Sequence, residues 1–243
     1  MKLLHHHARS NAQVRPQNTM QIVRHIFALL VAMVIVIYLI NQCRKPHGWL
    51  GRFFLWEMGG RHSSLTVWGL SLVSIERHYT TLDVGCGGGR TVSRLAGKAT
   101  EGKVFGVDYS AASVAASRRT NKELINAGRV EIHRASVSNL PFADGTFDLI
   151  TAVETHYYWP NLVADLKEVL RVLKPGGKFI IMAEAYKRRS IEPTQAAMKL
   201  LRAAFLTADE HRELLTAAGY SDVQIIEDRK KGWICAIGSR PFQ

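Results

Sequence analysis

A glycine-rich turn near residue 85 is the first feature whose residue types and spacing point to chemistry. It reads Asp83-Val84-Gly85-Cys86-Gly87-Gly88-Gly89-Arg90. Glycines where a strand turns into a helix let the backbone approach a bound ligand closely. The spacing does not fit the G-x-G-x-x-G pattern of dinucleotide sites, because neither Gly85 nor Gly87 is followed by the third glycine at the required distance. Asp83 would repel a pyrophosphate, so the loop favours a cationic ligand.

A second reactive segment follows a later apolar run and reads Glu154-Thr155-His156-Tyr157-Tyr158-Trp159-Pro160. His156 has a pKa range suited to general-base catalysis near neutrality. Glu154 could contact a bound cofactor or the molecule that reacts with it. Tyr157 and the next two aromatic residues could line a pocket for an aromatic or lipid molecule. The same aromatic residues could instead cover the edge of a sheet. Catalysis by proximity, without any base, also fits this segment.

The elements that must position these residues alternate between strand-like and helix-like patterns from Thr80 onward. Near-continuous apolar strands alternating with helices predict an α/β fold with a parallel sheet covered on both faces. The expected strands are Thr81–Gly85, Lys103–Asp108, Val130–Ala135, Phe147–Val153, Lys178–Ala183, Val223–Glu227 and Trp233–Ile237, and the expected helices are Thr91–Ala99, Ala111–Ala127, Leu162–Leu173 and one from Thr207 to near Gly219. Ser110 and Thr207 are placed as helix N-caps, the latter in a capping box. The short turn before Trp233 requires the last two strands to be antiparallel neighbours.

Five motifs in this order resemble the class I S-adenosylmethionine (SAM)-dependent methyltransferase superfamily, in its branch of ubiquinone/menaquinone-type and other small-molecule methyltransferases. They are Leu82–Arg90, Gly106–Ser110, Leu140–Phe142, Phe147-Asp148 and Leu173–Gly177. The resemblance covers about two thirds of the chain. It implies a Rossmann-like sheet of seven strands in the order 3-2-1-4-5-7-6 with the last strand antiparallel, and SAM as the cofactor.

The resemblance also implies roles for individual residues. The methionine portion of SAM is expected near Asp83, Gly85, Gly87 and Gly89, and the ribose hydroxyls on Asp108. Tyr109 is expected against the adenine, with Ser136 and Val137 at the adenine edge. Many relatives have an acid where Ser136 stands, so the adenine contact is expected to differ here. Glu154, His156 and Tyr157 are the candidate catalytic residues.

An apolar run near the N-terminus predicts a membrane anchor. Ile26–Ile40 contains no charged residue. As a helix it would span about 22 Å, and Met20–Ile40 would span about 31 Å, close to the roughly 30 Å hydrocarbon core of a bilayer. We therefore expect a single-pass protein: a disordered basic tail over residues 1–19, a transmembrane helix over 20–42, a connector over 43–79 and the catalytic domain over 80–243. The connector could lie on the bilayer surface or pack over the catalytic domain.

Alternatives to the anchor fit less well. A signal peptide lacks its cleavage site here, a transit peptide would not have an uninterrupted apolar run, and a core helix would need a partner. Residues 1–76 carry eight Lys and Arg against two acids, or +6 of the total net charge of +12. Anionic lipid explains this placement more simply than nucleic acid does. Basic residues balance on the two sides of the run, but we expect the catalytic domain to face the cytoplasm.

The remaining features limit the partners. The three cysteines are widely spaced, Cys86 and Cys235 fall in strand-like runs, and no metal-ligand spacing occurs, so we expect buried free thiols and no metal. The expected reaction is methylation of a lipophilic small molecule. Methylation of RNA or protein would use docking charges such as Lys187–Arg189 and Lys230-Lys231, and no nucleic-acid module accompanies them. A third alternative is a SAM-binding scaffold without turnover.

Overall fold

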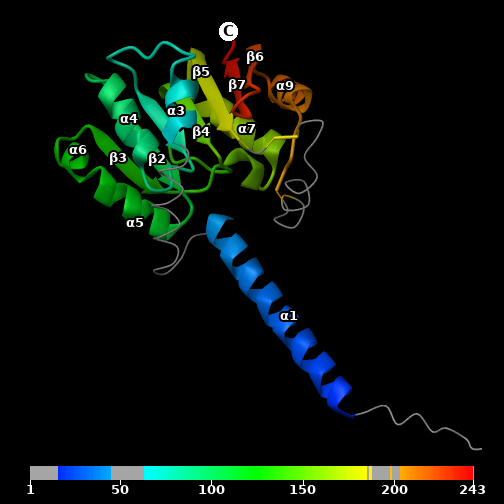
Figure 1. The fold of residues 1–243 in the computed structure, drawn as a ribbon. Coiled ribbons are helices and arrows are strands. Elements are labelled where there is room, and N and C mark those ends of the chain that lie inside the picture. Colours follow the sequence, from blue (N-terminus) through cyan, green and yellow to red (C-terminus); the bar gives the residue numbers. More distant parts are fainter. Residues whose placement is uncertain (1–15, 45–62, 185, 188–197, 199–202, 243) are drawn as a thin grey trace, which may run out of the picture. The chain divides into compact units, whose positions relative to one another are not determined.

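The computed structural model describes residues 16–44, 63–184, 186–187, 198 and 203–242 (Figure 1). The chain divides into two units, Met1–Ile40 and Asn41–Gln243, and each is described by itself. Most of the predicted disordered tail lies outside the described residues. Its last four residues are the start of a helix.

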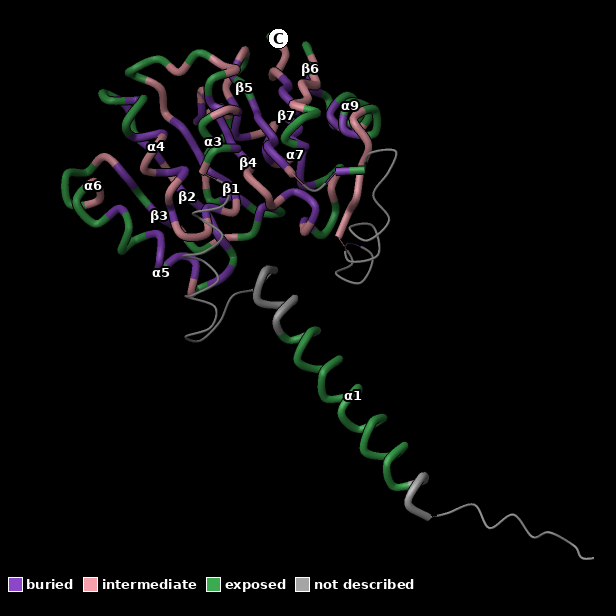
Figure 2. Tube along the Cα trace, viewed as in Figure 1, coloured by how far each residue is buried: buried purple, intermediate pink, exposed green. Residues whose placement is uncertain are grey.

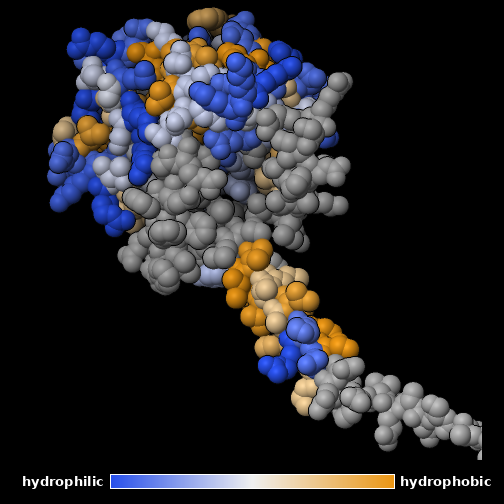
Figure 3. Space-filling view, in the orientation of Figure 1, coloured by the Kyte–Doolittle hydropathy of each residue, from blue (hydrophilic) through white to orange (hydrophobic). Residues whose placement is uncertain are grey.

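Helix α1, Pro16–Arg44, contains the apolar run. It begins at a proline, which the first turn of a helix tolerates because no backbone donor is needed there. Along its described length the side chains are exposed, and the large hydrophobic ones include Phe27 and Leu29, at 68% and 71% exposure (Figures 2 and 3). Nevertheless, among the described residues no helix is long and apolar enough to cross a membrane. The predicted transmembrane helix is therefore not shown.

The second unit contains a seven-stranded sheet in the order β3-β2-β1-β4-β5-β7-β6, as predicted. Among these strands, only β7 runs antiparallel to its neighbours. The strands are β1 (Thr81–Val84), β2 (Val104–Asp108), β3 (Val130–Arg134), β4 (Phe147–Val153), β5 (Leu173–Ala183), β6 (Ser221–Asp228) and β7 (Trp233–Ser239).

Helices cover both faces of the sheet (Figure 1). On one face, Leu166, Val169 and Leu215 of α7 and α9 pack in one hydrophobic core. On the other face, α3, α4 and α5 contribute to a second core, which contains Leu65 and Val92. The helices of this unit are α3 (Ser63–Leu70), α4 (Arg90–Lys98), α5 (Ala111–Thr120), α6 (Lys122–Asn126), α7 (Leu162–Val172) and α9 (Ala208–Ala217), with the 3₁₀ turn η1 (His156–Tyr158).

Helix α3 shows where part of the connector over residues 43–79 lies. Its residues Leu65 and Leu70 are fully or almost fully buried and belong to the same core as Met182 of β5. Gly69 permits this close approach, because a Cβ atom there would lie 2.4 Å from the Met182 sulfur. This described part of the connector therefore packs on the catalytic domain, whereas residues 45–62 lie outside the described residues.

Most predicted elements match the structure within two residues at each end, and two differ more. The single helix predicted over Ala111–Ala127 is divided into α5 and α6 at Asn121. The Asn121 side chain is buried, donates to the Gly89 carbonyl and accepts from the Ser93 hydroxyl, so this residue braces the glycine loop. The fifth strand begins at Leu173 rather than Lys178, because Leu173 already pairs with Phe147.

The predicted helix caps are confirmed. Ser110 accepts a hydrogen bond from the Ser113 amide at the start of α5, and Thr207 forms the expected capping box with Glu210 at the start of α9. Gly219 follows the last helix with a φ of +99°, a conformation that favours glycine. Cys86 and Cys235 are buried free thiols, also as predicted.

Candidate functional site

The candidate site lies where the strand order reverses. Strand β1 has β2 on one side and β4 on the other, so the connections that leave these strands diverge at its carboxyl end. In open α/β sheets, ligands bind in the crevice at such a position. Asp83 of β1 stands at this point, in register with Gly106 of β2 and Thr151 of β4.

Asp83 is a buried carboxyl group with one hydrogen-bond donor beside it. Its Oδ1 atom accepts a 2.7 Å hydrogen bond from the Thr151 hydroxyl. Burial raises the pKa of Asp83, the hydrogen bond from Thr151 lowers it and the nearby Asp108 carboxylate raises it, so that the pKa lies at about 7. Asp83 is therefore poised to take up or release a proton when a charged ligand arrives.

Asp108, at the end of β2, is the second buried acid. Its two carboxylate oxygens accept from the Gly87 and Ser110 amides, at 3.0 and 2.8 Å. Burial raises its pKa, and these hydrogen bonds counteract the effect. Within the described ranges, no lysine or arginine forms an ion pair with either acid. A ligand that brings both a cation and hydroxyl donors would therefore compensate the cost of burying these carboxylates.

The glycine loop requires glycine at two predicted positions. Gly85 has a φ of +74°, and a Cβ atom on it would lie 2.3 Å from the Thr155 hydroxyl oxygen. Gly89 has a φ of +80° and leaves no space between α4 and α5, where a Cβ atom would lie 2.4 Å from the Ser117 hydroxyl oxygen. Gly87 contributes its amide to Asp108. The loops after β1, β2 and β4 are thus fitted together.

The predicted adenine-side residues lie at the same edge of the sheet. Tyr109 follows Asp108 directly and is 42% exposed, so part of its ring is accessible. Ser136 lies two residues beyond β3, is exposed, and accepts a hydrogen bond from the Ser138 amide. Val137 is buried in the core cluster that also contains Val107, so its side chain packs rather than facing solvent.

Glu154 and Tyr157 lie together at the end of β4. The Tyr157 hydroxyl donates to one carboxylate oxygen of Glu154, and the Glu184 amide at the end of β5 donates to the other. Glu154 has a φ of +56°, a strained conformation for a residue with a side chain and one often found at functional sites. Burial and the neighbouring Glu154 raise the pKa of Tyr157, which keeps its hydroxyl protonated as a donor.

His156 is paired with a histidine that the sequence did not indicate. Its Nε2 atom lies 3.0 Å from Nε2 of His211 on α9, and both residues are 1% exposed. Burial lowers the pKa of His156 well below its usual value, and the neighbouring His211 lowers it further. His156 is therefore neutral near pH 7, and its Nδ1 atom is buried without a hydrogen-bond partner.

Four contacts of the site were not predicted: those made by Thr151, Thr155, Glu184 and His211. The sequence contains a signal for Thr151, which is a hydroxyl residue inside an otherwise apolar strand. It contains little that would indicate the other three contacts, because their partners lie far away in sequence. His211, for example, is 55 residues from His156.

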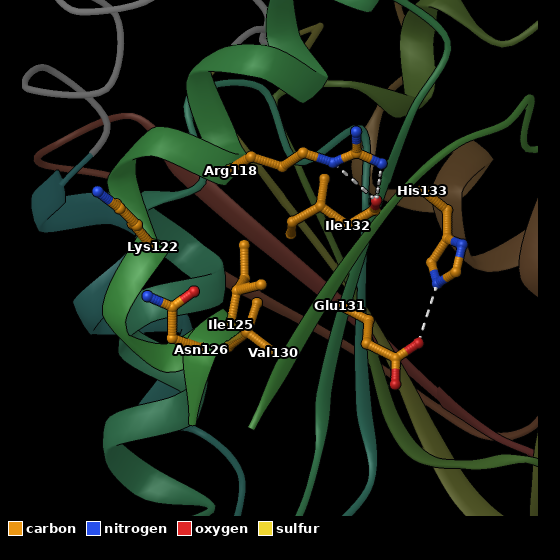
Figure 4. A pocket seen from close by; sticks show the side chains of 8 residues that line it. All are labelled: Arg118, Lys122, Ile125, Asn126, Val130, Glu131, Ile132 and His133. Carbon is orange, nitrogen blue, oxygen red and sulfur yellow. Dashed lines mark hydrogen bonds and ion pairs between the residues drawn. The ribbon is translucent and has the colours of Figure 1, made fainter. Parts of the chain in front are cut away.

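A separate pocket lies beside the outer strand β3, between it and α5 and α6 (Figure 4). There Arg118 donates from Nε and Nη2 to the carbonyl of Ile132, at 3.3 and 2.7 Å. None of the predicted site residues lines this pocket. In the described part of the chain, no group of three or more His, Cys, Asp and Glu residues could hold a metal ion.

Comparisons with known proteins agree with this geometry. Residues 82–181 match the model of a family described as a methyltransferase domain. The chain is 37% identical over 105 residues to a sterol 4-C-methyltransferase of Caenorhabditis elegans, covering 41% of this chain and 29% of that protein. It is 32% identical over 123 residues to a demethylmenaquinone methyltransferase of Bacillus mycoides, covering 50% and 52%. The chain thus spans about half or less of the length of these relatives.

A solved structure, that of a SAM-dependent methyltransferase from Aquifex aeolicus, superposes with a TM-score of 0.60 at 21% identity, covering 72% of this chain and 89% of that one. At this identity the likeness supports the fold alone.

Proposed function

We propose that this protein, whose residues 82–181 belong to the class I SAM-dependent methyltransferase superfamily, transfers a methyl group to a lipophilic small molecule while it is held at a membrane. The observation that carries the proposal is the switch-point crevice, where Asp83 and Asp108 leave two buried carboxylates without a cationic partner among the described residues. The cofactor is SAM.

The residues of the crevice fit this cofactor. When bound, SAM supplies an activated methyl group on a sulfonium. Asp83 would attract its positive charge, and the Asp108 carboxylate, which accepts from the Gly87 and Ser110 amides and the Ser113 side chain, would also accept from the ribose hydroxyls. Gly85 keeps the loop clear of a side chain where the backbone must come close to the ligand. Tyr109, Ser136 and Val137 would border the adenine.

The acceptor would enter beside the loop after β4. Glu154 is held there by the Tyr157 hydroxyl and the Glu184 amide, so its carboxylate is fixed rather than mobile. Tyr158, which is partly exposed, would give the entry an aromatic side, whereas Tyr157 and Trp159 are buried in the hydrophobic cores and cover the edge of the sheet. Two relatives carry names that specify a sterol and demethylmenaquinone, which supports a lipophilic acceptor.

Helix α1 would hold the enzyme at a membrane with its catalytic domain in the cytoplasm. Its described side chains include large hydrophobic groups at consecutive positions, so the helix has no continuous polar face to present to water. A lipid environment would remove this apolar surface from water. The attachment would also keep the enzyme in the thin layer that contains a lipophilic acceptor.

The basic runs give RNA or protein docking little support. Lys231 lies 3.9 Å from Asp228 and 4.4 Å from the centre of the Trp233 ring, so it already has local partners. Arg188 and Arg189 of the other run lie outside the described residues. RNA methylation, protein methylation and a scaffold without turnover are retained as outcomes of the test.

The test of the reaction is transfer of a labelled methyl group from SAM to extracted total lipid, total RNA and total protein in parallel. We expect label in the lipid fraction alone. The Asp108→Ala variant is the control for non-enzymatic labelling. Label in RNA or protein alone would replace the proposed acceptor class, and no label in any fraction, with SAM binding intact, would favour the scaffold.

The test of the membrane proposal compares the full chain with a variant that lacks residues 1–45. We expect the full chain to remain with membranes through salt and alkaline washing. The shortened variant should be soluble and keep its SAM affinity, because the second unit contains its own core. Full-length protein in the salt-washed soluble fraction would contradict the proposal.

A further inference from the structure

The hydrogen bonds around His156 and His211 determine where their protons lie. The Nδ1 atom of His211 is 2.7 Å from the Thr207 carbonyl oxygen. A carbonyl only accepts, so Nδ1 of His211 carries a proton. When His211 is neutral its Nε2 is then bare, and it must accept from Nε2–H of His156 at 3.0 Å. His156 in turn has a bare Nδ1.

The bare Nδ1 atom is the unexplained feature of this chain of hydrogen bonds. It is buried and has no hydrogen-bond partner. A buried acceptor without a donor destabilises the fold by about 1–3 kcal/mol, and a bound molecule that donates to this atom would remove that penalty. His156 is in η1, directly after Thr155. The Thr155 hydroxyl lies against Gly85 of the glycine loop, in the space that a side chain at that position would fill. The missing donor is thus expected on the molecule that binds beside this loop.

We propose that Nδ1 of His156 accepts the proton lost by the acceptor molecule, and that His211 is a positioning residue that fixes this tautomer and takes over the charge. The inference rests on the proposed methyl transfer. It adds the atom that receives the proton and a partner residue on α9, outside the segment that matches the family model.

The proton transfer balances within the two residues. The bond between the acceptor atom and its hydrogen breaks, its electron pair stays on that atom to bond the incoming methyl group, and the proton bonds to Nδ1 of His156. The proton on Nε2 of His156 then moves to Nε2 of His211. His156 is neutral again, and His211 is a cation whose Nδ1 still donates to Thr207. After the methylated product leaves, the proton on Nε2 of His211 returns to Nε2 of His156 and the proton on Nδ1 of His156 is released to solvent, which restores the starting tautomers.

The surroundings make His211 the better place for the charge. Burial lowers the pKa of both histidines, but the Thr207 carbonyl and the Glu210 carboxylate raise that of His211. Glu210 is itself held ionised, since its hydrogen bonds to Thr207 lower its pKa. Other titratable groups near the pair include Tyr157, whose ring is 4.9 Å from that of His156, and Glu154, to which the Tyr157 hydroxyl donates. On the side of His211 they include Asp209 and Lys187, the latter acting on Glu210.

The first test is nitrogen NMR of the full chain in detergent, with ¹⁵N-labelled histidine and assignment by His156→Gln and His211→Gln variants. Near neutral pH we expect bare Nδ1 and protonated Nε2 in His156, with the reverse in His211. As the pH is lowered, the first charge should appear on His211. The opposite tautomers, or a first charge on His156, would overturn the proposal. This readout needs no turnover, so it is independent of whether the methyl acceptor has been identified.

The second test is kinetic. His211→Leu removes the acceptor for Nε2–H of His156, and we expect turnover to fall about tenfold or more, with SAM affinity unchanged. His211→Gln offers an amide oxygen that can hold the tautomer but cannot take the charge, so its turnover should lie between the two. His133→Gln, on the outer strand, is the control and should match the wild type. Wild-type turnover and pH profile in a folded His211→Leu protein would refute the relay; if that variant does not fold, wild-type turnover in His211→Gln would do so.

Discussion

The two halves of the carboxyl edge of the sheet are built in different ways. In the half formed by β1 and β2, Asp83, Asp108 and the glycine loop come from one short stretch, and Asp108 is 21 residues from its partner Gly87. In the half formed by β4, β5 and α9, Glu154 is fixed by a residue 30 positions away and His156 by one 55 positions away. The residues expected to hold the cofactor therefore come from one stretch that a motif can encode, although Thr151 supports Asp83 from 68 positions away. In the acceptor half, the contacts of Glu154 with Glu184 and of His156 with His211 depend on how distant elements pack.

The largest expected effect is loss of the cofactor half by Asp108→Ala. Two charge-assisted hydrogen bonds to the ribose are worth about 1.5–3 kcal/mol each, so SAM affinity should fall by about tenfold or more. Calorimetric titration measures this. Asp144→Ala, an exposed acid on the turn before β4, is the matched control and should keep wild-type affinity. Unchanged affinity in Asp108→Ala would remove Asp108 from the site and with it the contrast between the halves.

Gly85→Ala should break the contact between the halves. The new Cβ atom would meet the Thr155 hydroxyl oxygen at 2.3 Å, on a backbone with positive φ. We expect a loss of stability of about 1–3 kcal/mol, measured by denaturant unfolding of the shortened variant. The matched control is Gly97→Ala in α4, where nothing lies within 4 Å and the helix should gain about 0.5–1 kcal/mol. Equal stability of the two variants would show that the Thr155 side chain moves away from the new Cβ atom at little cost in free energy.

The pH dependence of SAM binding should report Asp83. In the free protein burial raises the pKa of this carboxyl from 3.8 to about 7, and a bound cation would favour the charged form and lower that pKa again. Binding then releases a proton below pH 7, so affinity should fall as the pH drops below 7, by up to about tenfold per unit, and level off above it. Because the pKa of Asp83 is higher in the folded protein than in the unfolded chain, the free protein should lose stability as the pH rises from about 4 to 7.

The Asp83→Asn variant is the control for this pH effect. It lacks the titrating group, so its SAM affinity should be lower at high pH and independent of pH around 7. A wild-type affinity that does not change across pH 7 would place the cation of the ligand away from Asp83.

The smallest effect is expected from Glu154→Gln, which probes the acceptor half alone. The amide nitrogen of glutamine would face one of two donors, the Tyr157 hydroxyl or the Glu184 amide, so one hydrogen bond is lost. Turnover should fall by roughly fivefold to tenfold, since one net hydrogen bond is worth about 1 kcal/mol, while SAM affinity stays within about twofold. A parallel loss of SAM affinity would mean that the halves are not independent.

Prediction from sequence succeeded where the signal was local. The antiparallel β7, the Thr207 capping box and the Gly219 helix end follow from short patterns, whereas the strand order was implied by the family resemblance that the five motifs carry. The break at Asn121 was missed because the helical pattern continues through it, and the side chain that causes the break bonds to Gly89, 32 residues away. His211 was missed for the same reason, since nothing near it in sequence marks its partner.

The Arg118 side chain beside β3 has a consequence for association between molecules. In the described sheet β3 has no strand on its outer side, so its outward carbonyls could serve as a template for another chain. Arg118 occupies the carbonyl of Ile132 with two hydrogen bonds, and the charged Glu131 and Lys122 lie beside it (Figure 4). An incoming strand would have to displace a guanidinium and approach these charges. The β3 edge of the sheet is thereby protected against strand-to-strand aggregation.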